Sequence, residues 1–104
     1  MIPMQQIQSL ADTIASEFRP EKIILFGSHA RGQSGPDSDV DLLVLMPYVG
    51  HPARKAAEIV NRTHPGTFSL DVIVRTPGEF LERQKMRDWF MRDIAREGKV
   101  LYAA

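Results

Sequence analysis

The sequence contains no cysteine and carries no net charge, and each absence excludes a class of function. Without cysteine, the 104-residue chain can form no disulfide, no thiolate zinc site and no cysteine nucleophile. Lys plus Arg and Asp plus Glu number 13 each, so the formal net charge is zero. A protein that binds long nucleic acid mainly through a basic surface needs an excess of cations. We therefore expect no partner of that kind.

Long hydrophobic runs are also missing. No apolar run comes near the roughly 20 residues that a membrane-spanning helix needs, and no basic stretch followed by an apolar one opens the chain. We therefore expect a soluble, cytoplasmic protein that does not contact membranes. A chain of 104 residues with 43% hydrophobic residues is long enough for one core but not for two. We predict a single domain over residues 1–104.

Apolar periodicity and turn residues predict an alternation of helices and strands. The expected helices are 4–18, 28–31, 53–63 and 76–98, the last with a break at 84–87, and the expected strands are 23–26, 39–46, 69–75 and 100–102. This order favours an α/β sandwich of a small sheet packed against helices.

The last helix begins with three consecutive large apolar residues, Trp89, Phe90 and Met91. One helix cannot bury all three against the same core. We take Trp89, Phe90 and Ile94 as core candidates and expect two of the three consecutive residues to be buried. The excess, together with Met86, is expected to form a contact with a second copy or with a partner.

Three carboxylates begin or lead apolar segments. Ten residues separate Gly27-Ser28 from Asp39, Asp41 follows two residues later, and Asp71 leads a further apolar run. Residues two apart on a strand point to the same face. Two adjacent carboxylates repel each other unless a cation lies between them, and hard oxygen ligands suit Mg²⁺ or Mn²⁺. If Asp71 lies on the neighbouring strand, it joins the same face.

Such a trio can catalyse the attack of a hydroxyl oxygen on the α-phosphorus of a nucleotide. Two metal ions would bridge the attacking oxygen and the α-phosphate and stabilise the leaving pyrophosphate, while Asp71 helps to deprotonate the incoming hydroxyl. Gly27 allows the backbone to approach the phosphates, and Ser28 and the amides behind it offer hydrogen-bond donors. Arg31 can add a cation.

Other phosphate, calcium and nucleophile motifs do not fit. Gly27-x₄-Gly32 is not followed by the lysine of a P-loop. In a calcium loop starting at Asp37, Leu42 would stand where glycine is needed and Tyr48 where glutamate is needed. No Gly-x-Ser-x-Gly sequence surrounds Ser28.

The motifs Gly27-Ser28-His29-Ala30-Arg31-Gly32 and Ser38-Asp39-Val40-Asp41-Leu42-Leu43-Val44, followed by Asp71, resemble the polymerase-β-like nucleotidyltransferase superfamily. The small size and the ending from Ile94 to Tyr102 resemble its minimal branch, which includes the MNT-domain antitoxins that are paired with HEPN-domain toxins. The resemblance covers nearly the whole chain.

The resemblance implies a mixed β-sheet packed on helices and Mg²⁺-dependent transfer of AMP from ATP. In the MNT–HEPN pairs the acceptor is a tyrosine hydroxyl of the toxin, which becomes inactive, so the family implies an antitoxin and a HEPN-type toxin partner. Carried over residue by residue, Asp39, Asp41 and Asp71 would be the catalytic residues and would hold two metal ions. The nucleotide would be bound by Gly27 and Ser28, with Arg31 and Ser38 as further candidates.

Alternatives remain open at the level of single residues and of the whole protein. Ser28 can be only a helix cap, Asp39 and Asp41 can be solvated strand-edge acids, and His29 is expected to be solvated. The protein can be a binding module that neutralises its toxin by masking it, without catalysis. It can also transfer nucleotides to a small molecule such as an aminoglycoside, although the chain is short for enclosing one. Base preference and oligomeric state are not fixed by the sequence.

Overall fold

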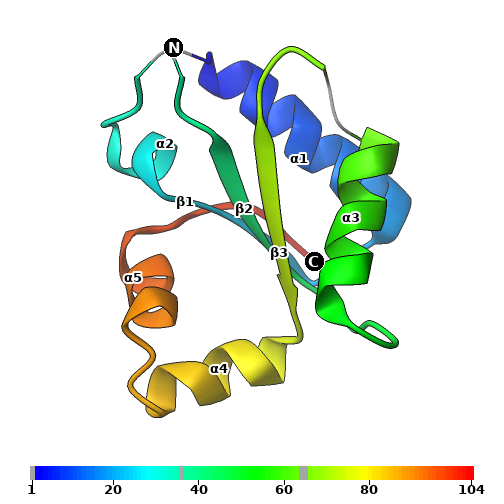
Figure 1. The fold of residues 1–104 in the computed structure, drawn as a ribbon, viewed down its shortest axis with the longest axis vertical. Helices are drawn as coiled ribbons and strands as arrows, with labels where there is room; N and C mark the ends of the chain where they lie inside the picture. Colours follow the sequence, from blue (N-terminus) through cyan, green and yellow to red (C-terminus); the bar gives the residue numbers. More distant parts are fainter. Residues whose placement is uncertain (1, 36, 64–65) are drawn as a thin grey trace.

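The computed structural model describes residues 2–35, 37–63 and 66–104. Within these ranges the chain forms a sheet of four strands with helices on both faces (Figure 1). The elements are α1 (Met4–Phe18), β1 (Lys22–Phe26), α2 (Ser28–Arg31), β2 (Val40–Leu45), α3 (Pro52–Thr63), β3 (Leu70–Arg75), α4 (Pro77–Lys85), α5 (Trp89–Glu97) and β4 (Lys99–Ala103). The predicted α/β architecture and element order are confirmed.

The sheet is mixed, and its strand order is β3-β2-β1-β4. Strand β1 runs antiparallel to both β2 and β4, whereas β2 and β3 run parallel. The two central strands are buried along nearly their whole length, as expected for strands covered on both faces. In the parallel pair, Asp41 lies opposite Asp71. The strand that begins near Asp71 therefore lies next to the strand that contains Asp41, which is the arrangement that brings Asp71 to the same face.

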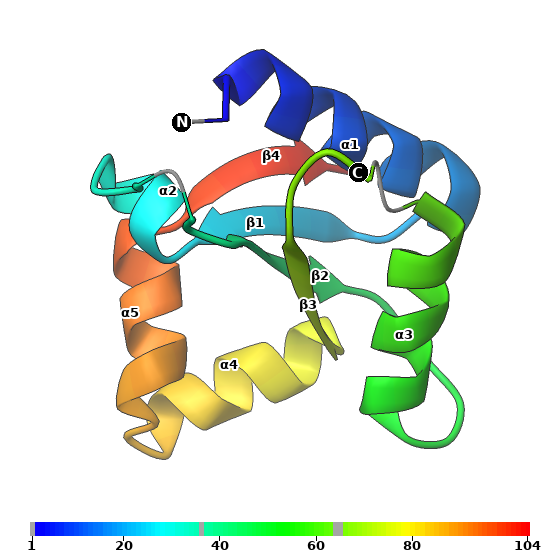
Figure 2. The same ribbon diagram turned by 45° about the horizontal axis from the view of Figure 1, so that its top comes forward.

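Alternate strand residues supply two separate cores, because successive side chains point to opposite faces. Helices α1 and α3 cover one face, whereas α4 and α5 lie along the other (Figures 1 and 2). Ile23 and Leu25 of β1 join the core under α1, while Ile24 and Phe26 join the core under α5. Asp41 is two residues before Leu43 on β2, so both side chains point to the same face. Leu43 belongs to the core under α5, and Asp41 therefore lies on the α5 face.

Local sequence signals explain where several helices begin and end. Helix α1 ends at Arg19, which adopts a left-handed conformation (φ 49°) just before Pro20. Helix α4 begins with a capping box, in which the Thr76 hydroxyl accepts from the Glu79 amide at 3.0 Å and the Glu79 carboxylate accepts from the Thr76 amide at 2.8 Å. Pro77 occupies the first helical position, as predicted.

Several sequence predictions are corrected. Trp89 and Phe90 are exposed and only Met91 of the three apolar residues is buried, because α5 rests on the sheet through Met91 and Ile94. Ala57, expected on the apolar side of α3, is exposed. Strand β2 begins at Val40, so Asp39 precedes the strand instead of opening it.

The interpretation of the helix after β1 also changes. Ser28 is the first helical residue and Gly27 occupies the cap position, with no side-chain cap bond. His29, expected to be solvated, is buried, with Nε2 3.3 Å from the Ser38 carbonyl oxygen. Pro65, which we expected to end the helix 53–63, lies outside the described residues. No helix among the described residues has the length and hydrophobicity needed to cross a membrane.

Candidate active site

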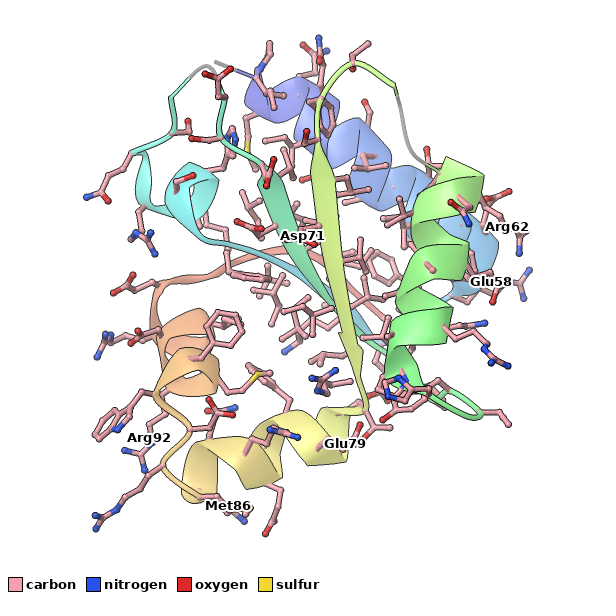
Figure 3. The ribbon with its side chains drawn as sticks, viewed as in Figure 1. Glu58, Arg62, Asp71, Glu79, Met86 and Arg92 are labelled. Carbon is pink, nitrogen blue, oxygen red and sulfur yellow. The ribbon has the colours of Figure 1, made fainter. Side chains whose placement is uncertain are left out.

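The three predicted acids gather at one end of the sheet. Asp41 and Asp71 are register partners on β2 and β3, and Asp39 precedes Asp41 by two residues. Figure 3 shows Asp71 near the end of β3 that lies toward α2. Asp41 is half-buried, whereas Asp39 and Asp71 are more open to solvent. The structure thus places Asp41 inside the site and the exposed Asp71 beside it, whereas Asp39 lies before the strand, within electrostatic range of Asp41.

Gly27 is required beside these acids for two reasons. Its backbone has φ 76° and ψ −155°, a region that is essentially reserved for glycine. A Cβ atom built on Gly27 would also collide with Oδ2 of Asp41. The missing side chain therefore leaves room for the Asp41 carboxylate beside the backbone at the start of α2.

A cleft of about 350 Å³ opens between this end of the sheet and α5. Asp41, Asp71 and Gly27 form one wall, and α5 forms the other. The lining comprises Phe26, Gly27, Arg31, Asp41, Asp71, Ile73, Phe90, Asp93, Ile94, Glu97 and Gly98. The cleft thus joins two segments that are far apart in the sequence, the Gly-Ser/Asp-x-Asp region and the last helix.

The α5 residues of the cleft were not found from the sequence as site residues. Phe90, Asp93, Ile94 and Glu97 line it, yet they form no recognisable motif with the acids. Their role depends on α5 packing across the end of the sheet, which no local pattern specifies. The only signal in the sequence was the surplus of large apolar residues at the start of that helix.

Arg31 lines the cleft and reaches toward α5. Its guanidinium Nη1 lies 3.8 Å from the Glu97 carboxylate on α5, and its Nε donates to Oε1 of Gln33 at 3.4 Å. The Arg31 side chain is 45% exposed, so this ion pair is weak in water and can be exchanged for another anion. Arg31 is therefore free to turn toward a phosphate group.

Electrostatics identify Asp41 as the destabilised member of the trio. Its pKa is raised, first by burial and then by the negative charges of Asp71 and Asp39. The charges of His29 and Arg31 act in the opposite direction and lower the pKa of Asp41. The carboxylates are therefore close enough to repel one another, and a cation between them would relieve that repulsion.

The two predicted serine ligands lie apart from the cleft lining. Ser28 is half-buried at the start of the four-residue helix α2. The Ser38 hydroxyl accepts a hydrogen bond from the Gly35 amide at 2.8 Å. Ser38 therefore stabilises the turn that leads into Asp39, and a nucleotide would contact it only if that bond were exchanged.

The carboxylate oxygens are chemically suited to a hard divalent cation. In the described part of the chain, no three His, Cys, Asp or Glu side chains are arranged to hold a metal ion as they stand. Oxygen ligands of this kind suit Mg²⁺, which also keeps positions open for water and phosphate oxygens.

Comparison with known proteins agrees with the fold and identifies the family. The profile of the nucleotidyltransferase domain family matches residues 7–102. The chain therefore belongs to the nucleotidyltransferase domain family. It is a nucleotidyltransferase by class. A curated relative from Methanocaldococcus jannaschii, provisionally named a protein adenylyltransferase, is 29% identical over 92% of this chain and 94% of its own.

Solved structures show the same fold. A protein of Sulfolobus solfataricus, provisionally named a nucleotidyltransferase, superposes with a TM-score of 0.64 at 21% identity, over 95% of this chain and 78% of its own. A toxin–antitoxin structure with AMP-PNP superposes with a TM-score of 0.60 at 18% identity, over 93% of this chain and 73% of its own. These likenesses confirm the expected mixed sheet packed on helices.

Proposed function

We propose that the protein is an antitoxin that transfers AMP from ATP to a tyrosine hydroxyl of a HEPN-type toxin. The observation that carries this proposal is the convergence of Asp39, Asp41 and Asp71 on one end of the sheet, beside a glycine whose missing Cβ makes room for Asp41. The provisional name of the curated relative and the AMP-PNP in a related toxin–antitoxin structure support this choice of nucleotide and partner.

The three carboxylates would hold Mg²⁺, or Mn²⁺, as two ions. Bound there, the ions would supply positive charge to the α-phosphate and to the leaving pyrophosphate. The Gly27 backbone admits the triphosphate, and Arg31 exchanges Glu97 for a phosphate oxygen. Ser28 and Ser38 are proposed as additional hydrogen-bond donors to the phosphates. Ser28 would have to become more exposed, and Ser38 would have to exchange its hydrogen bond with Gly35.

In the transfer, a tyrosine oxygen of the acceptor attacks the α-phosphorus of ATP. The new bond joins that oxygen to phosphorus, and the bond from phosphorus to the bridging oxygen of pyrophosphate breaks. Asp71, which is exposed at the rim of the cleft, takes the proton of the tyrosine hydroxyl. The products are an adenylylated tyrosine and pyrophosphate.

Intact-mass spectrometry tests the proposal. The chain is incubated with ATP, Mg²⁺ and a purified HEPN-type partner, and the mass of each protein is measured. We expect the partner to gain one or more AMP units, and we expect Asp41→Asn to lower the rate about 1,000-fold, since losing several kcal/mol of metal-assisted stabilisation has that effect. Asp37→Asn is the matched control, because Asp37 is an exposed acid in the turn before the trio.

Masking without catalysis is the competing function, and the exposed Trp89 and Met86 on the α4–α5 side of the molecule favour it as a second candidate. A masking protein needs a contact surface but no metal site. The double variant Asp39→Asn/Asp41→Asn separates the two functions in cells that express the toxin. Continued neutralisation by that variant would support masking, whereas loss of neutralisation with an intact complex would exclude it.

A further inference from the structure

The corner between α4 and α5 carries large apolar side chains that are about half or more exposed in the described chain. Met86 is 71% exposed, Trp89 is 68% exposed and Phe90 is 49% exposed. Figure 3 labels Met86 at this corner, at the end of the molecule farthest from the α1 face. Trp, Phe and Met are enriched in the buried centres of protein interfaces, and single Trp residues often contribute most of the binding energy.

Hydrogen bonds connect the two helices at this corner. Asp88 caps α5 by accepting from the Met91 amide at 3.1 Å, and the Asp88 amide donates to the Arg83 carbonyl at 3.1 Å. Arg92 Nε donates to the Gln84 carbonyl oxygen at 2.8 Å and so ties α5 to α4. A surface that is already ordered loses little conformational entropy when it binds.

The guanidinium of Arg92 also lies over the Trp89 ring, with 5.2 Å between its central carbon and the ring centroid. Such a cation–π contact fixes the indole in place and keeps its other face available. Trp89 therefore presents a flat, oriented apolar surface to the outside.

The apolar corner is continuous with the catalytic cleft. Phe90 is part of the corner and also lines the cleft with Asp41 and Asp71. Its ring packs edge-on against Phe26, with 5.5 Å between centroids and an interplanar angle of 84°. A protein that covers Trp89 and Phe90 would therefore lie directly beside the cleft that contains the acids.

Residues 82–92, which form the corner, carry an excess of positive charge, since four cations (Arg83, Lys85, Arg87 and Arg92) outnumber two acids (Glu82 and Asp88). In residues 2–35, 37–63 and 66–104, Lys85, Arg87 and Arg92 form no ion pair within 4.0 Å, whereas Arg83 is paired with Asp88 at 3.5 Å. A complementary surface would therefore carry carboxylates around an apolar centre, since opposite potentials steer encounter and fix register.

We propose that Met86, Trp89 and Phe90, ringed by Lys85, Arg87 and Arg92, form the docking surface for the acceptor protein. This inference rests on the proposed function and deepens it. The acceptor presents an apolar patch edged with Asp or Glu, and docking on the α4–α5 corner places its hydroxyl group in the cleft. Trp89 anchors the complex and takes no part in the chemistry.

The test measures affinity for the HEPN-type acceptor of the proposed function by titration calorimetry. We expect Trp89→Ser to weaken binding at least about 30-fold, the effect of a central interface residue. Val49→Ser is the matched control, because Val49 is 96% exposed and lies outside both the corner and the cleft lining. Its affinity for the acceptor should equal that of the unmodified chain.

A charge-reversal pair tests the complementary half of the proposal. Lys85→Glu should weaken binding of the acceptor and reduce its dependence on salt, whereas Arg54→Glu, an exposed arginine at the start of α3, should change neither. The affinity of each variant for ATP with Mg²⁺ should be unchanged, which shows that the cleft is intact.

The outcomes separate this inference from the proposed function. Acceptor binding that depends on Trp89 without any AMP transfer would support the docking surface and overturn the function. Transfer with acceptor affinity indifferent to Trp89→Ser would support the function and overturn the docking surface. If sedimentation shows a dimer of the chain that Trp89→Ser converts to monomers while acceptor affinity stays unchanged, the occupant is a second copy and the inference is wrong.

Discussion

The two faces of the sheet differ in how many apolar residues they bury and in which polar groups they carry. Among the described residues, the core under α1 and α3 contains sixteen buried residues, whereas the core under α4 and α5 contains six. Most of the apolar burial that stabilises the fold therefore lies on the first face. The second face is left partly open, and it is the one that carries the acids, the cleft and the exposed aromatic corner.

The difference between the faces shows why the acids can persist in this fold. Asp41 and Asp71 have the parity of the open face, so their carboxylates reach the cleft. A register shift of one residue would place them beneath α1, where an unpaired charge is costly. A thinly packed face thus gives room for charged groups that a dense core would exclude.

Matched isoleucine truncations on the two faces should produce the largest differences in stability. Ile14→Ala, in α1 and fully buried, should lower the free energy of unfolding by about 4 kcal/mol, and Ile94→Ala, in α5 beside the cleft, by about 2 kcal/mol. The second site costs less because water and neighbouring side chains can fill it from the cleft. Urea denaturation of both variants measures the two values, and equal losses would mean that the faces are packed alike.

Glycine substitutions at the two ends of α2 should give the next effect. Gly27→Ala should cost about 3 kcal/mol, because the backbone conformation is strained for alanine and the new Cβ meets Asp41. Gly32→Ala, also at positive φ but with open space around it, should cost about 1 kcal/mol. Thermal unfolding compares the two, and Gly27→Ala should in addition abolish transfer activity. Equal costs would show that Asp41 does not constrain Gly27.

Removal of the α4 cap should have a smaller and local effect. Helix α4 buries no residue, so its start depends on the Thr76–Glu79 capping box. Thr76→Ala should lower stability by about 1 kcal/mol and speed amide exchange in α4 more than in α1. Thr13→Ala is the control. It removes an exposed methyl group and a hydroxyl that donates to the Ser9 carbonyl inside α1, and it should change stability little. Uniform faster exchange in every helix would contradict a local role.

Neutralising Asp41 should have the smallest effect on stability, and its sign depends on pH. The pKa of Asp41 is raised in the folded state, so the native protein binds this proton more tightly than the unfolded chain does. Stability is therefore lost as pH rises through the raised pKa. In metal-free buffer, Asp41→Asn should be more stable than the unmodified chain at pH 7.

The stability advantage of Asp41→Asn should disappear as pH falls below the ordinary pKa of an aspartate. There the Asp41 carboxyl group is neutral in both the folded and the unfolded chain, as the asparagine always is. Urea melts across this pH range measure the difference, and Asp37→Asn should show none of it. An Asn variant that is less stable at neutral pH would mean that the Asp41 carboxylate is stabilised by contacts that outweigh its burial and its acidic neighbours.

Much of this protein could be predicted from sequence because the signals are local. The helix over 4–18, the start of a helix at 76–77 and a break in that segment near 84–87 were predicted and are confirmed. The Gly-Ser/Asp-x-Asp spacing indicated the family, and the family profile confirmed it. Period-two alternation predicted that Asp39 and Asp41 share a face, but Asp39 precedes the strand, so that alternation applies to Asp41 alone.

The errors arose where burial depends on partners that are distant in the chain. Trp89 and Phe90 were expected in the core, but α5 meets the sheet through Met91 and Ile94. His29 was expected in solvent, but the turn that ends at Ser38 covers it. Hydrophobicity and charge indicate whether a residue favours burial or solvent. Which of several apolar residues is buried depends on how the elements pack.

The sequence by itself determined the order of the elements, the chemical identity of the acids and the glycine beside them, because these follow from local periodicity and from the chemistry of single side chains. Only the tertiary structure decided that Asp41 lies opposite Asp71, that Arg31 faces Glu97 across a cleft, and that Trp89 remains outside. The physical reason is that strand pairing and helix docking join residues far apart in the chain, and their free energy depends on the packing of the whole fold.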